Sequence, residues 1–234
     1  MDKQEIIKQL AQISKEFHDT QHKIITEHPG INSSKDTRVT VFTNSYIVLD
    51  SIYVCLIVRS YEIAEPDWWS KLVQENKLTD KPSIEALSDF LDGFNTFAMS
   101  AYLSLLSGAI EGAFRSFHKA VFPSDKIPII FECVCENLLS DTGLGLSDYL
   151  ELLKLLRNLR NALAHNNGVH THDDDRASWN DVTIKFRKGQ RVDLGESGWK
   201  VMFVLASGIL DMLKKVVYST EIIGEPLIND ASYD

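Results

Sequence analysis

The stretch DYLELLKLLRNLRNALAH, residues 148–165, is the clearest helical segment of the sequence and decides the fold. On a helical wheel of about 100° per residue, its leucines at every third or fourth position fall within about 40° of one another and predict a buried stripe. These residues are Leu152, Leu156, Leu159 and Leu163. The polar residues opposite them are Lys154, Asn158, Asn161 and His165. Asn166-Asn167-Gly168 then ends the helix, because Asn and Gly tolerate the left-handed conformation of a helix C-terminus. We therefore expect an amphipathic core helix with a polar end.

Arg160, Asn161 and His165 at this end form the candidate catalytic group. The partial negative charge at a helix C-terminus favours the protonated imidazole of His165, which suits it to proton transfer. The planar guanidinium of Arg160 fits a phosphate group, and the amide of Asn161 can orient either neighbour. Lys154 and Arg157 add positive charge and are the candidate RNA-binding residues. This combination indicates phosphodiester cleavage that uses no metal and no other cofactor.

The string from Leu159 to Gly168 resembles the signature of HEPN domains, in which an Arg, a polar residue and, a few positions later, a His end a helix. Arg160, Asn161 and His165 occupy those places. The resemblance implies an all-helical bundle, homodimerisation and a metal-independent endoribonuclease that pairs two signatures across the dimer. In HEPN toxins that work with a nucleotidyltransferase antitoxin, a Tyr stands two places after the His. Asn167 stands there in this chain, so modification of a Tyr at that place is not expected.

The remaining sequence predicts a mainly helical bundle with one small β-hairpin before the last helix. We expect helices over 2–27, 37–63, 67–76, 81–121, 127–139 and 199–218, with Ser83 and Ser147 as caps. The segment 37–63 is rich in β-branched residues but too long for a strand, so a buried helix is favoured. The hairpin is expected to pair residues 182–186 with 191–194. We expect a single HEPN-like domain over 1–234, comprising an N-terminal helical extension (1–80), a core (81–222) and a loose tail (223–234).

Composition and charge narrow the classes of function. The formal net charge is −9, which disfavours a protein that coats nucleic acid with a basic face. The three cysteines, Cys55, Cys133 and Cys135, have no zinc-type spacing and indicate a reducing compartment. The polar N-terminus is not a signal peptide, and the apolar run 46–58 contains Asp50 and is too short to span a bilayer. A cytoplasmic protein without a membrane segment is expected.

Several alternatives stay open at this point. His165 could simply cap its helix while Arg160 pairs with Glu151 or Glu111. A metal site could combine His165, His170 and His172 with residues 173–175, although three consecutive Asp are more often a solvated charge run. Glu111 and Arg115, four residues apart, predict a surface ion pair. Trp68 and Trp69 could stack on bases, but packing in the core or an interface is favoured for at least one of them.

The leading hypothesis is an endoribonuclease that leaves 2′,3′-cyclic phosphate and 5′-OH ends, in a toxin or defence system with an antitoxin or other regulatory partner protein. The alternative is a non-catalytic HEPN module that binds RNA, a nucleotide or a protein partner, and a third reading is a purely structural helical subunit. In a regular helix Arg160 and His165 stand about 140° apart around the axis and about 7.5 Å apart along it. One copy would surround a phosphate poorly, so we expect a symmetric homodimer through the helix 148–165.

Overall fold

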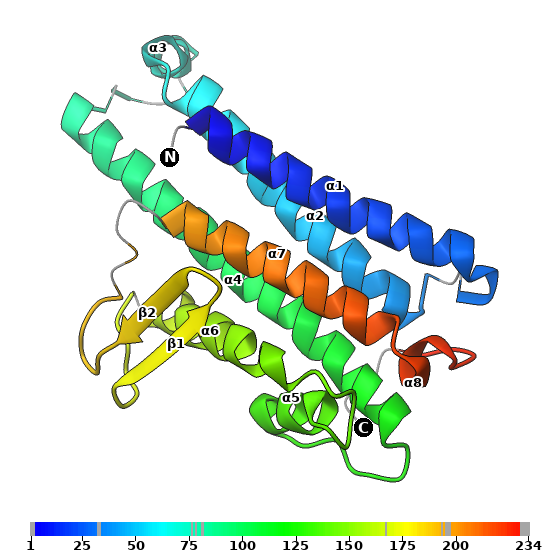
Figure 1. Cartoon of the computed structure of the whole chain (residues 1–234). Helices are drawn as coiled ribbons and strands as arrows, with labels where there is room; N and C mark the ends of the chain where they lie inside the picture. The colour runs from blue at the N-terminus through cyan, green and yellow to red at the C-terminus, as the bar shows by residue number, and fades with distance from the viewer. Residues whose placement is uncertain are drawn as a thin grey trace.

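The protein, shown as a computed structural model in Figure 1, is built around a bundle of long helices. The structure describes residues 3–31, 34–75, 77, 79–80, 82–166, 168–192, 194 and 198–229, and for Lys3, Tyr61, Glu62, Pro66, Ile84 and His165 the backbone alone. Helices α1 (Lys3–Glu27), α2 (Thr37–Val58), α4 (Ile84–Val121) and α7 (Gly198–Val217) form the bundle. Helix α1 packs against α2 and α7, and α2 packs against α4. The Tyr102 hydroxyl of α4 donates to the Met202 carbonyl of α7 at 3.3 Å. The predicted mainly helical fold is confirmed.

The two N-terminal helices are part of this bundle. In α1 the residues at helical spacing, Leu10, Phe17 and Ile24 among them, are buried, as the periodicity predicts. Helix α2 confirms that the segment rich in β-branched residues is helical, although its last five residues, Arg59–Ile63, form a π-helical turn. Residues 1–80 therefore do more than extend a core, because α1 and α2 supply two of the four bundle helices.

A buried ion pair fastens the start of α2 to the C-terminal segment. Asp36 caps α2, accepting from the Arg38 amide at 3.0 Å, and its carboxylate pairs with the Arg38 guanidinium at 2.6 Å. Both side chains have no exposed surface. Arg38 also donates to the carbonyls of Ile222, Ile223 and Glu225. Every charge in this buried cluster thus has a partner, as a stable interior requires.

The C-terminal segment corrects the expected loose tail. Helix α8 (Thr220–Ile223) follows α7, and Ile228 is buried. The Thr37 amide donates to the Ile228 carbonyl at 2.8 Å, and Asp36 forms a β-bridge with Asn229. The tail is therefore packed as far as Asn229, and its residues 230–234 lie outside the described part.

Two predicted helix boundaries are wrong. Helix α5 is Phe131–Leu139, so residues 127–130 precede it, and Ile129 is 93% exposed. The apolar composition of residues 127–130 favoured a helix, but Pro128 has no amide hydrogen to donate. The Arg115 guanidinium also donates hydrogen bonds to the carbonyls of Pro128 and Ile129, which are then not available to a helix. Ser147 does not cap the next helix. It begins a short 3-10 turn, Ser147–Tyr149, without a side-chain capping bond.

The other predicted helices are confirmed with small shifts. Helix α3 is Pro66–Gln74, with Pro66 in its first turn, and the predicted end at Asn76 lies outside the described residues. Ser83 caps α4 by accepting from the Ala86 amide. Trp68 and Trp69 of α3 contact each other edge to face, and the Trp69 indole donates to the Ile63 carbonyl at 2.7 Å.

The hairpin precedes α7, as expected, but one of its strands was misplaced. Strand β2 is Val182–Phe186, and it pairs with β1, Asp175–Trp179, not with residues 191–194. Asn180, at the two-residue turn, has a positive φ of 50°, which suits Asn in a tight hairpin. Arg191 instead bridges Val169. Strand β1 begins within the acidic run 173–175 and was not predicted, because three consecutive Asp are typical of a loop.

Two helices are long and apolar enough to cross a membrane by length and composition alone. They are α2 and the Glu85–Val121 part of α4, and 39% and 44% of their most apolar windows are buried. The expected apolar run 46–58 is only part of α2. Core helices of soluble proteins pass the same test, so the location of the protein stays a prediction.

Candidate functional site at the end of α6

The helix that carries the candidate residues is α6 (Leu150–Arg160), followed by the π-helical turn η4 (Asn161–His165). The predicted leucine stripe is confirmed: Leu152, Leu156 and Leu159 are buried, and Leu163 is partly buried against the core. Leu153 and Leu155 are buried too. Helix α6 is thus enclosed by α4, α5, α7 and strand β1.

The predicted polar face of α6 is largely covered by β1. Lys154 pairs with Asp175 at 2.8 Å and donates to the Arg176 carbonyl at 3.0 Å. Asn158 is buried and donates to Asp175 at 2.9 Å. Burial raises the pKa of Asp175, but the hydrogen bonds from Lys154 and Asn158 outweigh it, so the pKa lies below its ordinary value. This part of the face therefore holds the hairpin in place, and a second copy would meet β1 there.

Arg157 is also engaged within the chain. Its guanidinium forms an ion pair with Glu132 of α5. The hydrogen bond from Arg157 is the main reason why the pKa of Glu132 is lowered. Of the two candidate RNA-binding residues, Lys154 and Arg157, each thus has a carboxylate partner. Their positive charge is largely neutralised before any ligand arrives.

Arg160 differs from these two cations. Its side chain is only partly exposed, and its buried Nε has no hydrogen-bond partner among the described residues. The suggested partner Glu111 pairs with Arg115 at 2.8 Å, which confirms that predicted ion pair, although both side chains are mostly buried. Among the described residues no salt bridge to Arg160 is formed. A buried guanidinium nitrogen without an acceptor is costly, so this position favours an anionic ligand.

The π-helical turn changes the geometry expected for Arg160 and His165. A π-turn bonds residue i to residue i+5, so positions five apart lie nearly one above the other. The expected separation of about 140° applies only to a regular α-helix. The backbone positions of Arg160 and His165 therefore share one side of the helix. The side chain of His165 lies outside the described part of the structure.

Hydrogen bonds at the end of η4 hold the turn. The Asn166 side chain donates to the Asn161 carbonyl at 2.9 Å, and the Gly168 amide donates to the Ala162 carbonyl at 2.8 Å. Gly168 has a φ of +87°, as expected of a glycine that ends a helix. On the other side, the Ser100 hydroxyl of α4 donates to the Leu163 carbonyl at 3.2 Å. Asn161 itself is partly exposed beside Arg160.

The alternative metal site is not assembled in the described residues, which contain no group of three His, Cys, Asp or Glu able to hold an ion. His170 is buried, and its Nε2 contacts the Asp173 carbonyl at 2.9 Å. Asp173 pairs with Lys188, and Asp174 accepts from the Lys188 amide. Through these contacts with Lys188, Asp173 and Asp174 join the loop before β1 to the loop after β2.

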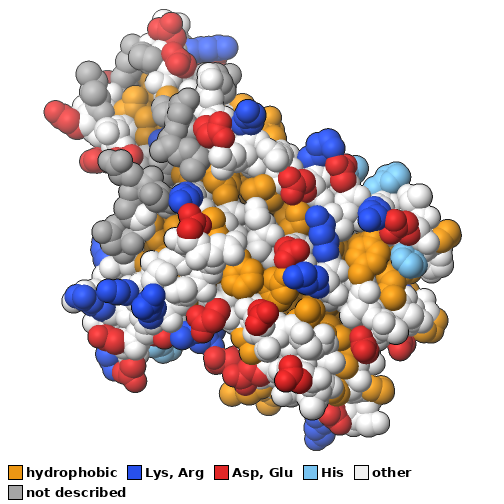
Figure 2. Space-filling model, in the orientation of Figure 1, with side chains coloured by type: hydrophobic (Ala, Val, Ile, Leu, Met, Phe, Trp, Pro, Cys, Tyr) orange, Lys and Arg blue, Asp and Glu red, His pale blue; other side chains and the backbone are white. Residues whose placement is uncertain are grey.

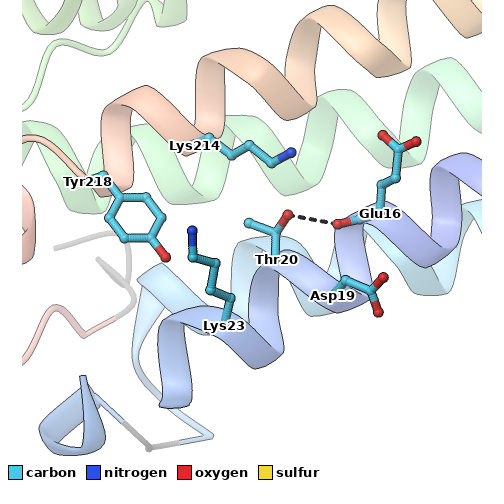
Figure 3. A pocket seen from close by; sticks show the side chains of 6 residues that line it. All are labelled: Glu16, Asp19, Thr20, Lys23, Lys214 and Tyr218. Carbon is cyan, nitrogen blue, oxygen red and sulfur yellow. Dashed lines mark hydrogen bonds between the residues drawn. The ribbon is translucent and has the colours of Figure 1, made fainter. Parts of the chain in front are cut away.

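Two pockets lie away from the candidate residues. Figure 3 shows one between α1 and α7, where Lys23 and Lys214 stand among acidic and hydroxyl side chains. Lys23 is 3.7 Å from Glu27, and the Tyr218 hydroxyl donates to Glu27 at 3.0 Å. The second follows α3 and includes Trp68. Charges of both signs alternate over the face in Figure 2, so this face presents no uniform field to a polyanion.

Comparison with known proteins adds no assignment, since no family model, curated protein or solved structure matches the chain. The function of this site is therefore inferred from its residues and geometry alone. Sequence reasoning proposed Arg160 and Asn161 as site residues but did not find the contacts of Asp175, Glu132 and Ser100, which hold α6 and η4 in place. These contacts join segments distant in the sequence, so no local pattern predicted them.

Proposed function

We propose that the chain is a metal-independent endoribonuclease of the HEPN type, which leaves 2′,3′-cyclic phosphate and 5′-OH ends. The observation that supports this most is Arg160, whose guanidinium has a buried, unpaired nitrogen and no carboxylate partner among the described residues. A phosphodiester is an anion of the right shape for this fork. Asn161 and the backbone of His165 belong to the same π-helical turn, and such turns are frequent at functional sites.

The proposed chemistry is transesterification within the RNA. The ribose 2′-OH loses its proton to His165 and attacks the adjacent phosphorus, forming the cyclic phosphate as the bond from phosphorus to the 5′ oxygen breaks. A second proton donor, His165 of the other copy in a dimer, protonates the leaving 5′ oxygen. Arg160 stabilises the negative charge that builds on the phosphoryl oxygens, and Asn161 orients these groups. No metal takes part in this scheme.

The structure refines the expected role of the other cations. Lys154 and Arg157 are engaged with Asp175 and Glu132. We therefore propose that they contribute less to RNA affinity than Arg160 does. We also propose a cytoplasmic enzyme in a toxin or defence system, held by an antitoxin or other partner protein.

A second candidate is a non-catalytic module that binds RNA, a nucleotide or a protein partner at Arg160. The net charge of −9 and the neutralised cations around the site favour it. Such a module needs the unpaired guanidinium but no proton transfer. The two candidates therefore differ in their dependence on His165.

The test is a cleavage assay on a mixed RNA pool in excess EDTA. We expect cleavage to persist and to fall by about 10²–10⁴-fold in His165→Ala and by about 10²–10³-fold in Arg160→Ala. Arg176→Ala, which removes the same charge from an exposed position of β1, is the matched control and should leave the rate unchanged. RNA binding that depends on Arg160 without cleavage would select the second candidate. If neither cleavage nor binding occurs, both candidates are overturned.

A further inference from the structure

One face of α4 is apolar over most of its length, and the described residues leave much of it exposed. The residues of this face, which we call the α4 stripe, follow one another at helical spacing: Ala86, Phe90, Phe94, Phe97, Ala101, Leu105, Gly108 and Gly112. Phe97 is 65% exposed, Leu105 53% and Phe90 47%. Large exposed aromatic side chains in a row mark a surface that another molecule covers.

The exposed side of α2 continues this surface. Ile47, Val54 and Val58 are 49%, 53% and 42% exposed. Helices α2 and α4 run antiparallel and side by side, and the Arg59 guanidinium at the end of α2 donates to the Leu91 carbonyl. From Ala86 to Gly112 the stripe is about 39 Å long, and two helices are about 20 Å wide, so the face covers about 800 Å². That is about the area that each partner contributes to a stable protein interface.

The charges around this face favour a protein partner over a lipid bilayer. The N-terminal end of α4 is acidic, with Glu85, Asp89 and Asp92, and an anionic membrane surface would repel it. Helix α1, which packs along α2, exposes Lys8, Lys15 and Asp19, so α2 cannot enter lipid without them.

The stripe is complementary to itself about Ala101. If two copies pack α4 against α4 in opposite directions, Ala101 meets Ala101 and Phe97 meets Leu105 of the second copy. Phe94 then meets Gly108, and Phe90 meets Gly112. In each pair with a glycine, a large ring faces a position without a side chain. Such self-complementarity is what a two-fold symmetric interface requires.

The glycines of the stripe have no reason within the chain itself. A Cβ built at Gly108 or Gly112 would meet no atom within 4 Å. Glycine inside a helix costs roughly 0.5–1 kcal/mol relative to alanine, and nothing in the fold of one copy requires it here. Close approach of a second molecule does supply a reason, because only glycine leaves room for a ring against the helix backbone.

From this geometry we infer that the α4 stripe binds a second copy of the chain, antiparallel and about a two-fold axis at Ala101. The partner is thus another molecule of the same protein. This inference concerns assembly and does not depend on the proposed ribonuclease activity.

The arrangement has a consequence for η4, which rests on the proposed function. Leu91, beside α2, and Ser100, beside η4, lie about 180° apart around α4. The stripe therefore lies between them, with η4 on one flank. In the antiparallel dimer the two-fold axis lies in the plane of the interface and perpendicular to α4. Rotation about this axis places the η4 flanks of both copies on the same side of the dimer. The two η4 turns, each with Arg160 and His165, would then stand across the interface from one another.

The first test is sedimentation of the full chain without RNA, with vesicles of phosphatidylcholine and phosphatidylglycerol as a separate arm. We expect a dimer that Phe97→Asp or Ala101→Arg weakens by at least ~30-fold, as loss of a central contact does. Leu227→Asp, which charges an exposed apolar side chain elsewhere, is the matched control and should stay dimeric. Circular dichroism checks that each variant is folded. A monomer at ~100 μM wild-type chain, or binding to vesicles in its place, would overturn the inference.

The second test determines the register of the interface. In a chain carrying Cys55→Ser, which removes the exposed native thiol, Ala101→Cys should cross-link to itself on mild oxidation. Phe97→Cys and Leu105→Cys should each cross-link poorly alone and efficiently when mixed. A dimer that forms without this pattern uses another surface and contradicts the inference. Because no step measures cleavage, its failure is distinguishable from failure of the proposed ribonuclease.

Discussion

His118, in the last turn of α4, is a buried polar residue that the fold leaves unsatisfied. Neither ring nitrogen has a hydrogen-bond partner in the described part of the chain, and the ring centroid lies 5.0 Å from that of Phe122. Burial lowers the pKa of His118, an effect that Asp125 opposes and Lys119 reinforces. The side chain is therefore buried in its neutral form.

Replacing His118 tests this directly. Because its pKa is lowered on folding, the unfolded chain takes up the proton first as pH falls through about 6.5, and stability is lost there. His118→Leu removes that loss and the unpaired nitrogens, so we expect a gain of about 1 kcal/mol at pH 8 and a larger gain at pH 5. Urea unfolding at the two pH values measures it. Equal gains at both would show that His118 does not titrate on unfolding.

Gly208 in α7, unlike the glycines of the α4 stripe, is required by packing within the chain. A Cβ there would lie 2.5 Å from the Trp179 indole nitrogen and 3.1 Å from Leu152. Gly208→Ala should therefore lower the free energy of unfolding by about 1–3 kcal/mol. Gly93→Ala, in α4 with nothing within 4 Å, is the control and should raise it by about 0.5–1 kcal/mol. Thermal unfolding of both variants settles the point, and a neutral Gly208→Ala would contradict it.

At the scale of elements, the contact of α6 with β1 depends on one carboxylate. Asp175 accepts from Lys154 and Asn158, and its pKa is lowered on balance. This interaction stabilises the fold above the ordinary Asp pKa of about 3.9 and is lost as pH falls through the lower folded value. The hairpin should therefore detach from α6 in acid before the four long helices separate.

Asp175→Asn tests this attachment. We expect a loss of about 1–3 kcal/mol at pH 7 and a difference from wild type that shrinks between pH 5 and pH 3. Near-ultraviolet circular dichroism of Trp179 follows the hairpin during urea unfolding. Asp181→Asn, whose partner Lys200 is exposed, should cost less than about 0.5 kcal/mol. A loss that stays constant with pH would exclude the carboxylate as its cause.

Periodicity predicts helices well here but not their hydrogen-bond pattern. The leucine stripe of α6 and the apolar residues of α1 follow a 3.6-residue repeat, so these elements could be found. The π-turns at Arg59–Ile63 and Asn161–His165 keep the same residue types while one extra residue enters the turn. Strand β1 was missed because it begins within the acidic run. The helix that carries the candidate residues was thus predicted from sequence, but the shared side of the Arg160 and His165 backbone positions was not.

At the scale of the whole molecule, the arrangement of copies and the chemistry can be tested together. If two η4 turns form one cleft, a chain with His165→Ala and a chain with Arg160→Ala should regain activity when mixed. Each mixed dimer would retain one intact Arg160 and one intact His165. It would lack the second His165 that protonates the leaving 5′ oxygen, so only part of the activity should return.

The expected recovery is a rate well above that of either variant alone, measured after sedimentation has shown dimers. Adding Phe97→Asp to both chains should abolish the recovery, because it blocks the α4 stripe. Recovery that survives Phe97→Asp would place the shared cleft at another interface. Full activity of a monomer would exclude a shared cleft altogether.

The buried pair of Asp36 and Arg38 also bears on how the chain is made. Arg38 finds three of its acceptors in the carbonyls of Ile222, Ile223 and Glu225. During synthesis on the ribosome, residues up to Glu225 must emerge before this guanidinium can reach all of its acceptors. Although α1 and α2 are translated first, the junction between α2 and the C-terminal segment can form only after that. A product terminated before Ile222 therefore leaves a buried cation without three of its acceptors, which quality control can recognise.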